Sequence, residues 1–415
     1  MKTIKIFVIL LLAVTAANAQ KMSLQNIFDT IKLRNPALKM YDAEINSMDA
    51  AAIGAKSWMS PEVGAGFFMT PYDPKMWKKD EMMGTPGMGQ FMLSAQQMFP
   101  NQKQKAEYNY MAAMSAAEKY RKSASLNDLY AEAKRNYYAW IILLKKEKVL
   151  DNNEKILSFM LRDAELRYKN NLGKLDAYYK AKAAQGNLQN MRVMLDNEIH
   201  LKKVMLNVLM NRKHMQELDI DTAYEMKSYA SVIFDSSYFS GRRSDIRAID
   251  EDMHINVLKQ ETERAKMKPE FGVKYDHMFA WAGNPWQFSL MGMMRIPLSW
   301  STKMNKANIK SLDYKNEALQ QQKEMMYNQM SGMAYGMRTE LNAKKQQVAL
   351  YETNIIPALQ KNFQTMQIGY QQNTEELFML YDAWEALNMS QIEYLNQVQQ
   401  LLEMQVQLEK VLEIQ

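Results

Sequence analysis

Most of the chain follows the hydrophobic spacing of α-helices. Between Gln102 and Tyr168 no proline or glycine occurs, and apolar residues recur every three or four positions. A single helix of this length would be on the order of 100 Å long. From Leu380 to Leu412 the seam positions alternate steps of four and three, which is the spacing of a coiled coil. The pattern predicts a mainly α protein built from long coiled-coil helices.

Two regions, 61–100 and 269–297, instead alternate between apolar and polar residues. Each predicts two β-strands joined by a loop, and each strand is about nine to eleven residues long, enough to cross a bilayer when tilted. The apolar strand faces carry aromatic and aliphatic residues, among them Phe91, Leu93, Phe99, Phe271, Phe288 and Leu290. The opposite faces carry polar residues and methionines, among them Gln90, Met92, Met98, Ser289, Met291 and Met293. The sequence therefore predicts a small β part made of four amphipathic strands.

This order of helices and strands occurs twice along the chain. Pro269 matches Pro61 at an offset of 208 residues, and Tyr370 matches Tyr168 at an offset of 202. The segments YKNNLGKLD and YQQNTEELF then correspond as breaks between antiparallel helices. We interpret the chain as an internal duplication. The first repeat covers 20–240, with the hairpin 61–100, a helical tip near 170–176 and an irregular segment at 213–240; the second covers 241–415, with the hairpin 269–297 and a tip near 371–378.

The amino terminus predicts export from the cytoplasm. Residues 1–19 contain Lys2 and Lys5, an apolar run and a final Ala-Asn-Ala, which is the pattern of a secretory signal peptide cleaved before Gln20. Its removal lowers the formal net charge from +6 by the two lysines. Charges of both signs are interspersed along the helices, so we do not expect a nucleic-acid surface. The chain has no cysteine, which excludes disulfides and thiolate metal sites.

Four strands are too few to close a barrel around a lumen. An open sheet edge is not tolerated in hydrocarbon, so the strands must pair with those of further copies of the chain. Three copies with four strands each give a 12-stranded barrel, whereas two copies give eight strands with little lumen. Long helices attached to such a barrel would form a hollow tube, so the pattern favours a homotrimer.

The sequence offers little support for catalysis. Its four histidines are widely spaced, and no metalloprotease, nucleophile-elbow or phosphate-loop motif occurs. We expect neither an enzyme nor a bound cofactor.

The features that carry a family resemblance are the opening SLQNIFDTIKLRNPAL, the segment RRSDI, the two hairpins and the two break motifs. Through them the chain resembles the TolC family of outer membrane efflux proteins over essentially its whole mature length. The resemblance implies a trimer with a 12-stranded barrel in the outer membrane of a Gram-negative bacterium and an α-helical tunnel in the periplasm. It also implies two partners, a periplasmic adaptor protein and an inner-membrane pump of the resistance-nodulation-division type.

The resemblance also assigns roles to residues at the tips. In the family the helical breaks contact the adaptor, which points to Asn171, Leu172, Gly173, Asp176, Asn373, Thr374, Glu375 and Leu377. Acidic side chains after the second tip narrow the family's tunnel. Asp382 matches one of these aspartates, while Met379 stands where another is common. An ordinary solvated carboxylate is the alternative reading of Asp382.

Methionine is unusually frequent, with 37 residues. Thioethers are soft ligands that suit Cu(I) and Ag(I), and this abundance resembles the heavy-metal, CusC/CzcC-like branch of the family, which partners metal-exporting pumps. The candidate metal contacts are Met82, Met83, Met88, Met92, Met98, Met291 and Met293. Adaptable packing is the alternative, and it is favoured for a helical stripe such as Met326, Met330, Met333 and Met337.

Two other functions remain compatible with the sequence. A channel of the same fold could export drugs or secreted polypeptides, because the pump selects the cargo. A protein of another class, a periplasmic coiled-coil scaffold or adaptor, would carry the hairpins as a small soluble β unit. Outward-facing aromatic residues on four strands of membrane-crossing length favour the channel.

Overall fold

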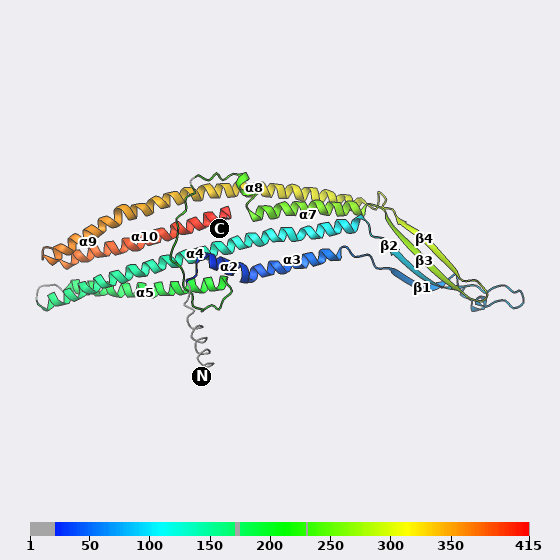
Figure 1. The fold of residues 1–415 in the computed structure, drawn as a ribbon, viewed down its shortest axis with the longest axis horizontal. Coiled ribbons are helices and arrows are strands. Elements are labelled where there is room, and N and C mark those ends of the chain that lie inside the picture. The colour runs from blue at the N-terminus through cyan, green and yellow to red at the C-terminus, as the bar shows by residue number, and fades with distance from the viewer. Residues whose placement is uncertain (1–20, 171–174, 230, 415) are drawn as a thin grey trace, which may run out of the picture. The chain divides into compact units, whose positions relative to one another are not determined.

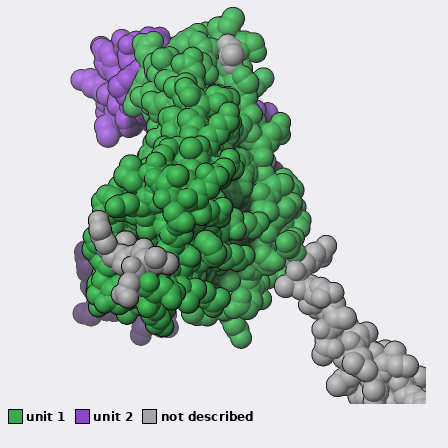
Figure 2. Space-filling view, turned by 90° about the vertical axis from the view of Figure 1, so that its left-hand side faces the viewer, with its two compact units in different colours: residues 1–40, 122–244, 326–415 green, residues 41–121, 245–325 purple. Residues whose placement is uncertain are grey.

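The computed structural model describes residues 21–170, 175–229 and 231–414. The described chain is mainly helical, with one small antiparallel sheet, as the sequence predicts. Figure 1 shows its helices and its sheet, and Figure 2 shows the two compact units into which the chain divides. Of the described residues, unit 1 contains those within 21–40, 122–244 and 326–414, and unit 2 contains 41–121 and 245–325. The predicted signal peptide, 1–19, lies outside the described residues.

Unit 1 is a helical assembly. The helix α4, Gln102–Lys169, runs without interruption, as its lack of proline and glycine predicts, and contributes its carboxyl-terminal part to this unit. Ser23 caps the first described helix by accepting a hydrogen bond from the Asn26 amide at 3.3 Å. Helix α8, Lys303–Leu350, is separated from helix α9, Ile356–Gln371, by a π-helical turn just before Pro357, which has no amide hydrogen to donate. The elements that contribute to unit 1 are α2 (Leu24–Arg34), α4 (Gln102–Lys169), α5 (Leu175–Leu209), α6 (Ser236–Ser240), α8 (Lys303–Leu350), the π turn (Tyr351–Ile355), α9 (Ile356–Gln371) and α10 (Leu377–Leu412).

Two hydrophobic clusters hold unit 1 together. The first joins α4, α5, α9 and α10 through residues such as Leu157, Leu188, Phe363 and Trp384. The second joins α2 to α4 and α5, and in it the ring of Phe28 stacks on Tyr130 with centroids 4.2 Å apart. The predicted α10 seam is buried at Val398, Leu401, Leu408 and Leu412. The coiled-coil spacing in the sequence therefore identifies the packed side of this helix.

Unit 2 contains the sheet and the helices that lead into and out of it. The strand order is β1-β2-β3-β4, and all three pairings are antiparallel. Pairing of β2 with β3 joins the two predicted hairpins into one sheet (Figure 1). The elements that contribute to unit 2 are α3 (Pro36–Gly54), β1 (Glu62–Phe68), a short 3-10 turn (Pro74–Trp77), β2 (Gln90–Met98), the beginning of α4, α7 (Ser244–Lys266), β3 (Glu270–Ala280), β4 (Gln287–Arg295) and the beginning of α8.

The first strand is shorter than predicted. It has seven residues, whereas β2, β3 and β4 have nine, eleven and nine, within the predicted range. Met69 adopts a left-handed conformation with a φ of 48°, and the chain leaves the sheet at that point. Alternation of residue types identified the strand but could not locate this change of backbone direction.

Each compact unit takes segments from both halves of the sequence. The predicted repeats, 20–240 and 241–415, therefore contribute to both units, and the duplication stays a prediction. No helix in the described chain is long and apolar enough to cross a membrane.

Candidate functional site

The sheet presents two chemically different faces. Along each paired strand, successive residues point to opposite faces. One face carries Val63, Phe67, Phe91, Leu93, Phe271, Tyr275, Phe279, Phe288, Leu290 and Met294. The other face carries Gln90, Met92, Ser94, Gln96, Met98, Lys274, Asp276, Met278, Gln287, Ser289, Met291, Met293 and Arg295. The strand register thus separates the residues into the two predicted sets.

The apolar face is the more exposed of the two. Phe67, Phe288 and Leu290 expose 70%, 71% and 67% of their surface. On the polar face Asp276 is 3% exposed and forms an ion pair with Lys274, with Nζ to Oδ1 3.0 Å apart. A sheet in water buries its apolar residues, so this arrangement is the reverse of the one expected for a soluble domain.

Tryptophans lie at both ends of this sheet. Trp77, Trp281 and Trp286 lie in or beside the strand-connecting loops, and the rings of Trp77 and Trp281 are 6.2 Å apart between centroids. Trp58 and Trp300 lie in the segments that connect the sheet to α3 and α8, and they are 62% and 72% exposed. Aromatic residues that border an apolar band on both sides are typical of membrane-spanning strands. Sequence reasoning missed this feature, although five of the seven tryptophans flank the strands.

The seven candidate metal-binding methionines fall into two groups. Met82, Met83 and Met88 lie in the loop between β1 and β2, and their side chains are 98%, 81% and 52% exposed. Met92, Met98, Met291 and Met293 share the polar face of the sheet. Met278, which is not among the seven, lies directly opposite Met92 on that face. The structure therefore brings the strand methionines together in register and leaves the loop methionines exposed.

The helical tip between α9 and α10 forms a tight turn where the sequence predicts a break. Asn373 adopts a left-handed conformation with a φ of 59°, which asparagine tolerates better than most residues. The amides of Thr374 and Glu375 both donate to the Gly369 carbonyl, at 2.9 and 3.3 Å. A Cβ on Gly369 would lie 2.6 Å from the Cγ of Glu375, so the glycine allows this close approach.

The predicted adaptor-contact residues have different surroundings. Asn373, Thr374 and Glu375 are exposed at the turn, and Asp176 is exposed in the first turn of α5. Leu377 is half-buried and packs against the first hydrophobic cluster of unit 1. Asn171, Leu172 and Gly173 lie outside the described residues.

The end of α4 is bonded to the turn between α9 and α10. Arg167 donates to the Asn373 side-chain oxygen at 2.7 Å and lies over the ring of Tyr370. The Tyr370 hydroxyl donates a hydrogen bond to Asp163, which also forms an ion pair with Arg167. Burial, together with the Asp163 carboxylate, raises the pKa of Tyr370, so the hydroxyl stays protonated and can donate. These contacts join helices from the two halves of the sequence.

Asp382, the predicted aperture residue, is in an ion pair. Its Oδ1 accepts from the Nζ of Lys180 at 2.6 Å, and the same ammonium lies 3.7 Å from the ring centroid of Phe378. The side chains of Lys180 and Asp382 remain 32% and 46% exposed. Lys180 precedes Asp382 by 202 residues, the offset that matches Tyr168 with Tyr370, so the two residues occupy equivalent positions of the predicted repeats. Met379 is 47% exposed on the same helix.

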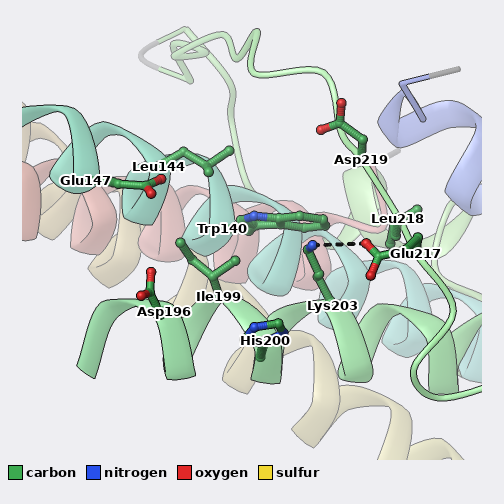
Figure 3. Close-up of a pocket in the computed structure, with 10 residues that line it drawn as sticks. All are labelled: Trp140, Leu144, Glu147, Asp196, Ile199, His200, Lys203, Glu217, Leu218 and Asp219. Carbon is green, nitrogen blue, oxygen red and sulfur yellow. Dashed lines mark hydrogen bonds and ion pairs between the residues drawn. The ribbon is translucent and has the colours of Figure 1, made fainter. Parts of the chain in front are cut away.

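A shallow hollow of about 440 Å³ opens elsewhere in unit 1 (Figure 3). Its charged lining contains Lys203 and Glu217, whose Nζ and Oε2 atoms are 3.5 Å apart. Trp140, Leu144 and Ile199 form its apolar part. In the described part of the chain no three His, Cys, Asp or Glu residues are grouped to hold a metal ion.

The fold is similar to solved structures of outer-membrane channels. The outer-membrane channel OprN matches with a TM-score of 0.72 at 14% identity, covering 94% of this chain and 89% of that one. The outer membrane protein VceC of Vibrio cholerae matches with a TM-score of 0.72 at 15% identity, covering 94% and 95%. CusC, described in connection with transmembrane channel formation, matches with a TM-score of 0.69 at 14% identity, covering 95% of each chain.

By sequence, no protein-family model and no curated protein matches this chain. At these low identities the similarity concerns the fold. The chain therefore has the fold of these outer-membrane channels, as the resemblance to the TolC family implies.

Proposed function

We propose that the protein is the outer-membrane channel of a tripartite efflux system in a Gram-negative bacterium. It conducts cargo passively from the periplasm to the exterior and has no catalytic activity. The observation that carries this proposal is the reversed sheet, whose exposed face is apolar and bordered by tryptophans at both ends. Lipid stabilises such a surface, whereas water does not.

The sheet also supports assembly of three copies. Strands β1 and β4 are its edges, and each has backbone groups on one side that pair with no strand of the described chain. In hydrocarbon these groups need hydrogen-bond partners, which the edges of neighbouring copies supply. A homotrimer joins β1 of each copy to β4 of the next and closes a 12-stranded barrel.

The helical tips are the proposed docking site for a periplasmic adaptor, which links the channel to an inner-membrane pump. The exposed residues Asn373, Thr374 and Glu375 support this role because they lie at the turn. Their amides are held by the carbonyls of Tyr370, for Asn373, and of Gly369, for Thr374 and Glu375. Replacing Thr374 and Glu375 with alanine should reduce adaptor cross-linking while leaving the level of trimer unchanged. Loss of trimer in that variant would contradict a docking role.

The membrane assignment is tested directly by fractionation and conductance. The full chain should appear in the outer-membrane fraction as a heat-modifiable trimer and should conduct ions in a planar bilayer. A soluble periplasmic monomer without conductance would overturn the channel proposal and support the scaffold alternative. The same bilayer experiment can compare Asp382→Asn with the unmodified channel to test control of the aperture.

The cargo is proposed separately from the fold. CusC is no more similar to the chain than OprN or VceC, so the comparisons favour no heavy-metal branch. Methionines on the polar sheet face favour copper or silver as cargo, because thioethers bind soft cations. Replacing Met92, Met98, Met291 and Met293 with leucine should lower tolerance of copper and silver without reducing trimer levels. Unchanged tolerance would favour drugs or polypeptides as the cargo.

A further inference from the structure

The strand methionines are distributed against the usual hydrophobic pattern. Six methionines lie in the strands, and five of them, Met92, Met98, Met278, Met291 and Met293, share the polar face, while Met294 alone lies on the apolar face. If methionine served only as an adaptable apolar residue, the exposed apolar face would be its expected place. Its concentration among glutamine, serine, lysine and arginine side chains needs another explanation.

Two of these methionines flank a glycine. In the sheet register Met98 on β2 pairs with Gly272 on β3, and Gly272 pairs with Met293 on β4. The three positions therefore form one row across the sheet and point to the same face. Neighbouring strands are about 4.8 Å apart, so the Met98 and Met293 backbones lie about 10 Å apart with the glycine between them.

The glycine provides room for a thioether. A Cβ on Gly272 would lie 2.5 Å from the Met98 sulfur, which shows that this sulfur rests on the glycine backbone in the middle of the row. Gly272 is buried, and the side chains of Met98 and Met293 are both half-buried. Met293 has a long flexible side chain that can reach the same space from the opposite strand. Two soft sulfur ligands can thus converge above Gly272.

We propose that Met98 and Met293 form a thioether pair that binds a soft monovalent cation, Cu(I) or Ag(I), above Gly272. This inference rests on the proposed function and deepens it by naming the place on the polar face where the proposed cargo binds. Two thioethers favour Cu(I) and Ag(I) over hard cations such as Mg²⁺ and Ca²⁺, which prefer oxygen ligands. The pair carries no charge, so a bound cation is held by sulfur donation and can be released along the channel.

The test uses the purified full chain in detergent and titrates it with Ag(I), which needs no reductant. The double variant Met98→Leu/Met293→Leu should bind Ag(I) at least tenfold more weakly at its tightest site. Leucine has a similar volume, so the sheet should be retained, and trimer level and circular dichroism would verify this. X-ray absorption at the silver edge should show sulfur neighbours that disappear in the double variant.

Two matched single variants separate the thioether pair from methionine content in general. Met294→Leu removes a methionine adjacent to Met293 but on the apolar face, and its Ag(I) affinity should match that of the unmodified chain. Gly272→Ala retains both methionines but places a Cβ 2.5 Å from the Met98 sulfur and 2.7 Å from the Gln97 carbonyl oxygen. With trimer level and circular dichroism unchanged, it should weaken Ag(I) binding at least tenfold. Equal Ag(I) affinity in the double variant, or an equal loss in Met294→Leu, would overturn the proposal.

The same samples keep this inference distinct from the channel function. Ag(I) binding is measured on the protein itself, and conductance is measured in a planar bilayer without silver. A conducting channel that binds no Ag(I) would overturn the thioether pair and leave the channel proposal intact. A protein that binds Ag(I) through Met98 and Met293 without conducting would overturn the channel proposal alone.

Discussion

The helices of unit 1 bury their large apolar side chains, whereas the sheet exposes side chains of the same kind. In unit 1, Trp384 and Leu401 are 2% and 0% exposed, whereas Phe288 and Leu290 in the sheet are 71% and 67% exposed. Burial of apolar surface accounts for the first arrangement in water. The second is stable only where the surroundings of the sheet are themselves apolar. The difference indicates that the sheet and the helices of unit 1 suit different surroundings.

Unit 1 also contains buried charged side chains, and these have ion-pair and hydrogen-bond partners. Lys134 and Glu409 are 4% and 1% exposed, and their Nζ and Oε2 atoms are 2.6 Å apart. Tyr229 donates to the other carboxylate oxygen at 2.6 Å, and Gln405 donates to the same oxygen at 3.2 Å. Glu409 therefore has several partners, as a buried carboxylate requires.

The largest expected effect follows from breaking this buried pair. Lys134→Met removes the buried cation of Glu409 and leaves only Lys227, whose Nζ lies 3.7 Å from Oε1, so it should destabilise the protein by about 3 kcal/mol. The double variant Lys134→Met/Glu409→Leu removes both charges and should recover most of that loss. Urea unfolding followed by circular dichroism measures both values. A single variant as stable as the unmodified chain would show that Lys227 alone compensates the charge of Glu409.

The next largest effect is expected from a charge placed on the apolar face of the sheet, and it tests whether this face contacts lipid. Leu290 lies near the middle of β4 on the apolar face, and Leu290→Arg should cost about 2–4 kcal/mol in a bilayer because a charge then faces lipid. Ser289→Arg, one residue earlier on the polar face, should cost much less. Folding of the two variants into lipid vesicles compares the faces directly. Equal costs would contradict the assignment of the apolar face to lipid.

Lowering the pH should have a smaller effect on the stability of unit 1. Burial acts to raise the pKa of Glu409, but the charge and hydrogen bond of Lys134 and the hydrogen bond of Tyr229 outweigh it and lower the pKa below its ordinary value of 4.5. A carboxylate with a lowered folded pKa stabilises the protein above about pH 4.5, and this stabilisation is lost as the pH falls through the folded pKa. One pKa unit corresponds to about 1.4 kcal/mol.

Unfolding of unit 1 should therefore become easier below about pH 4.5. The double variant Lys134→Met/Glu409→Leu lacks the titrating carboxylate and should lose less stability over the same range. Urea midpoints between neutral pH and pH 3 measure the two slopes. Parallel slopes would assign the acid effect to other carboxylates.

Hydrophobic spacing was sufficient to predict most of the fold. The long helix α4, the seam of α10 and the alternation of β2, β3 and β4 each follow one period over many residues, so local errors do not obscure the pattern. The end of β1 was missed because it depends on a left-handed conformation at Met69, which is not a glycine. Backbone direction at a single residue leaves no periodic signal.

The site was less predictable because it depends on contacts between distant strands and helices. Residue type alone placed Met82 and Met98 in one group, yet one lies in an exposed loop and the other against Gly272. Pairing of β2 with β3 brings Met92 and Met278 together across a large sequence separation. The ion pair of Lys180 with Asp382 was equally hidden, because equivalent positions of two repeats need not lie in contact.

The smallest expected effect concerns the ion pair of Lys180 with Asp382 in unit 1. Both side chains are substantially exposed, so either Lys180→Gln or Asp382→Asn should change stability by less than about 1 kcal/mol. The pair connects α5 to α10 close to the described tip, so each variant should loosen this contact and raise single-channel conductance. If the effect comes from the pair, the double variant should conduct no more than either single variant, because the contact is already lost. If the conductance increases of the two single variants add in the double variant, the charge of Asp382 acts independently of Lys180. Unchanged conductance in all three variants would exclude Asp382 from the aperture.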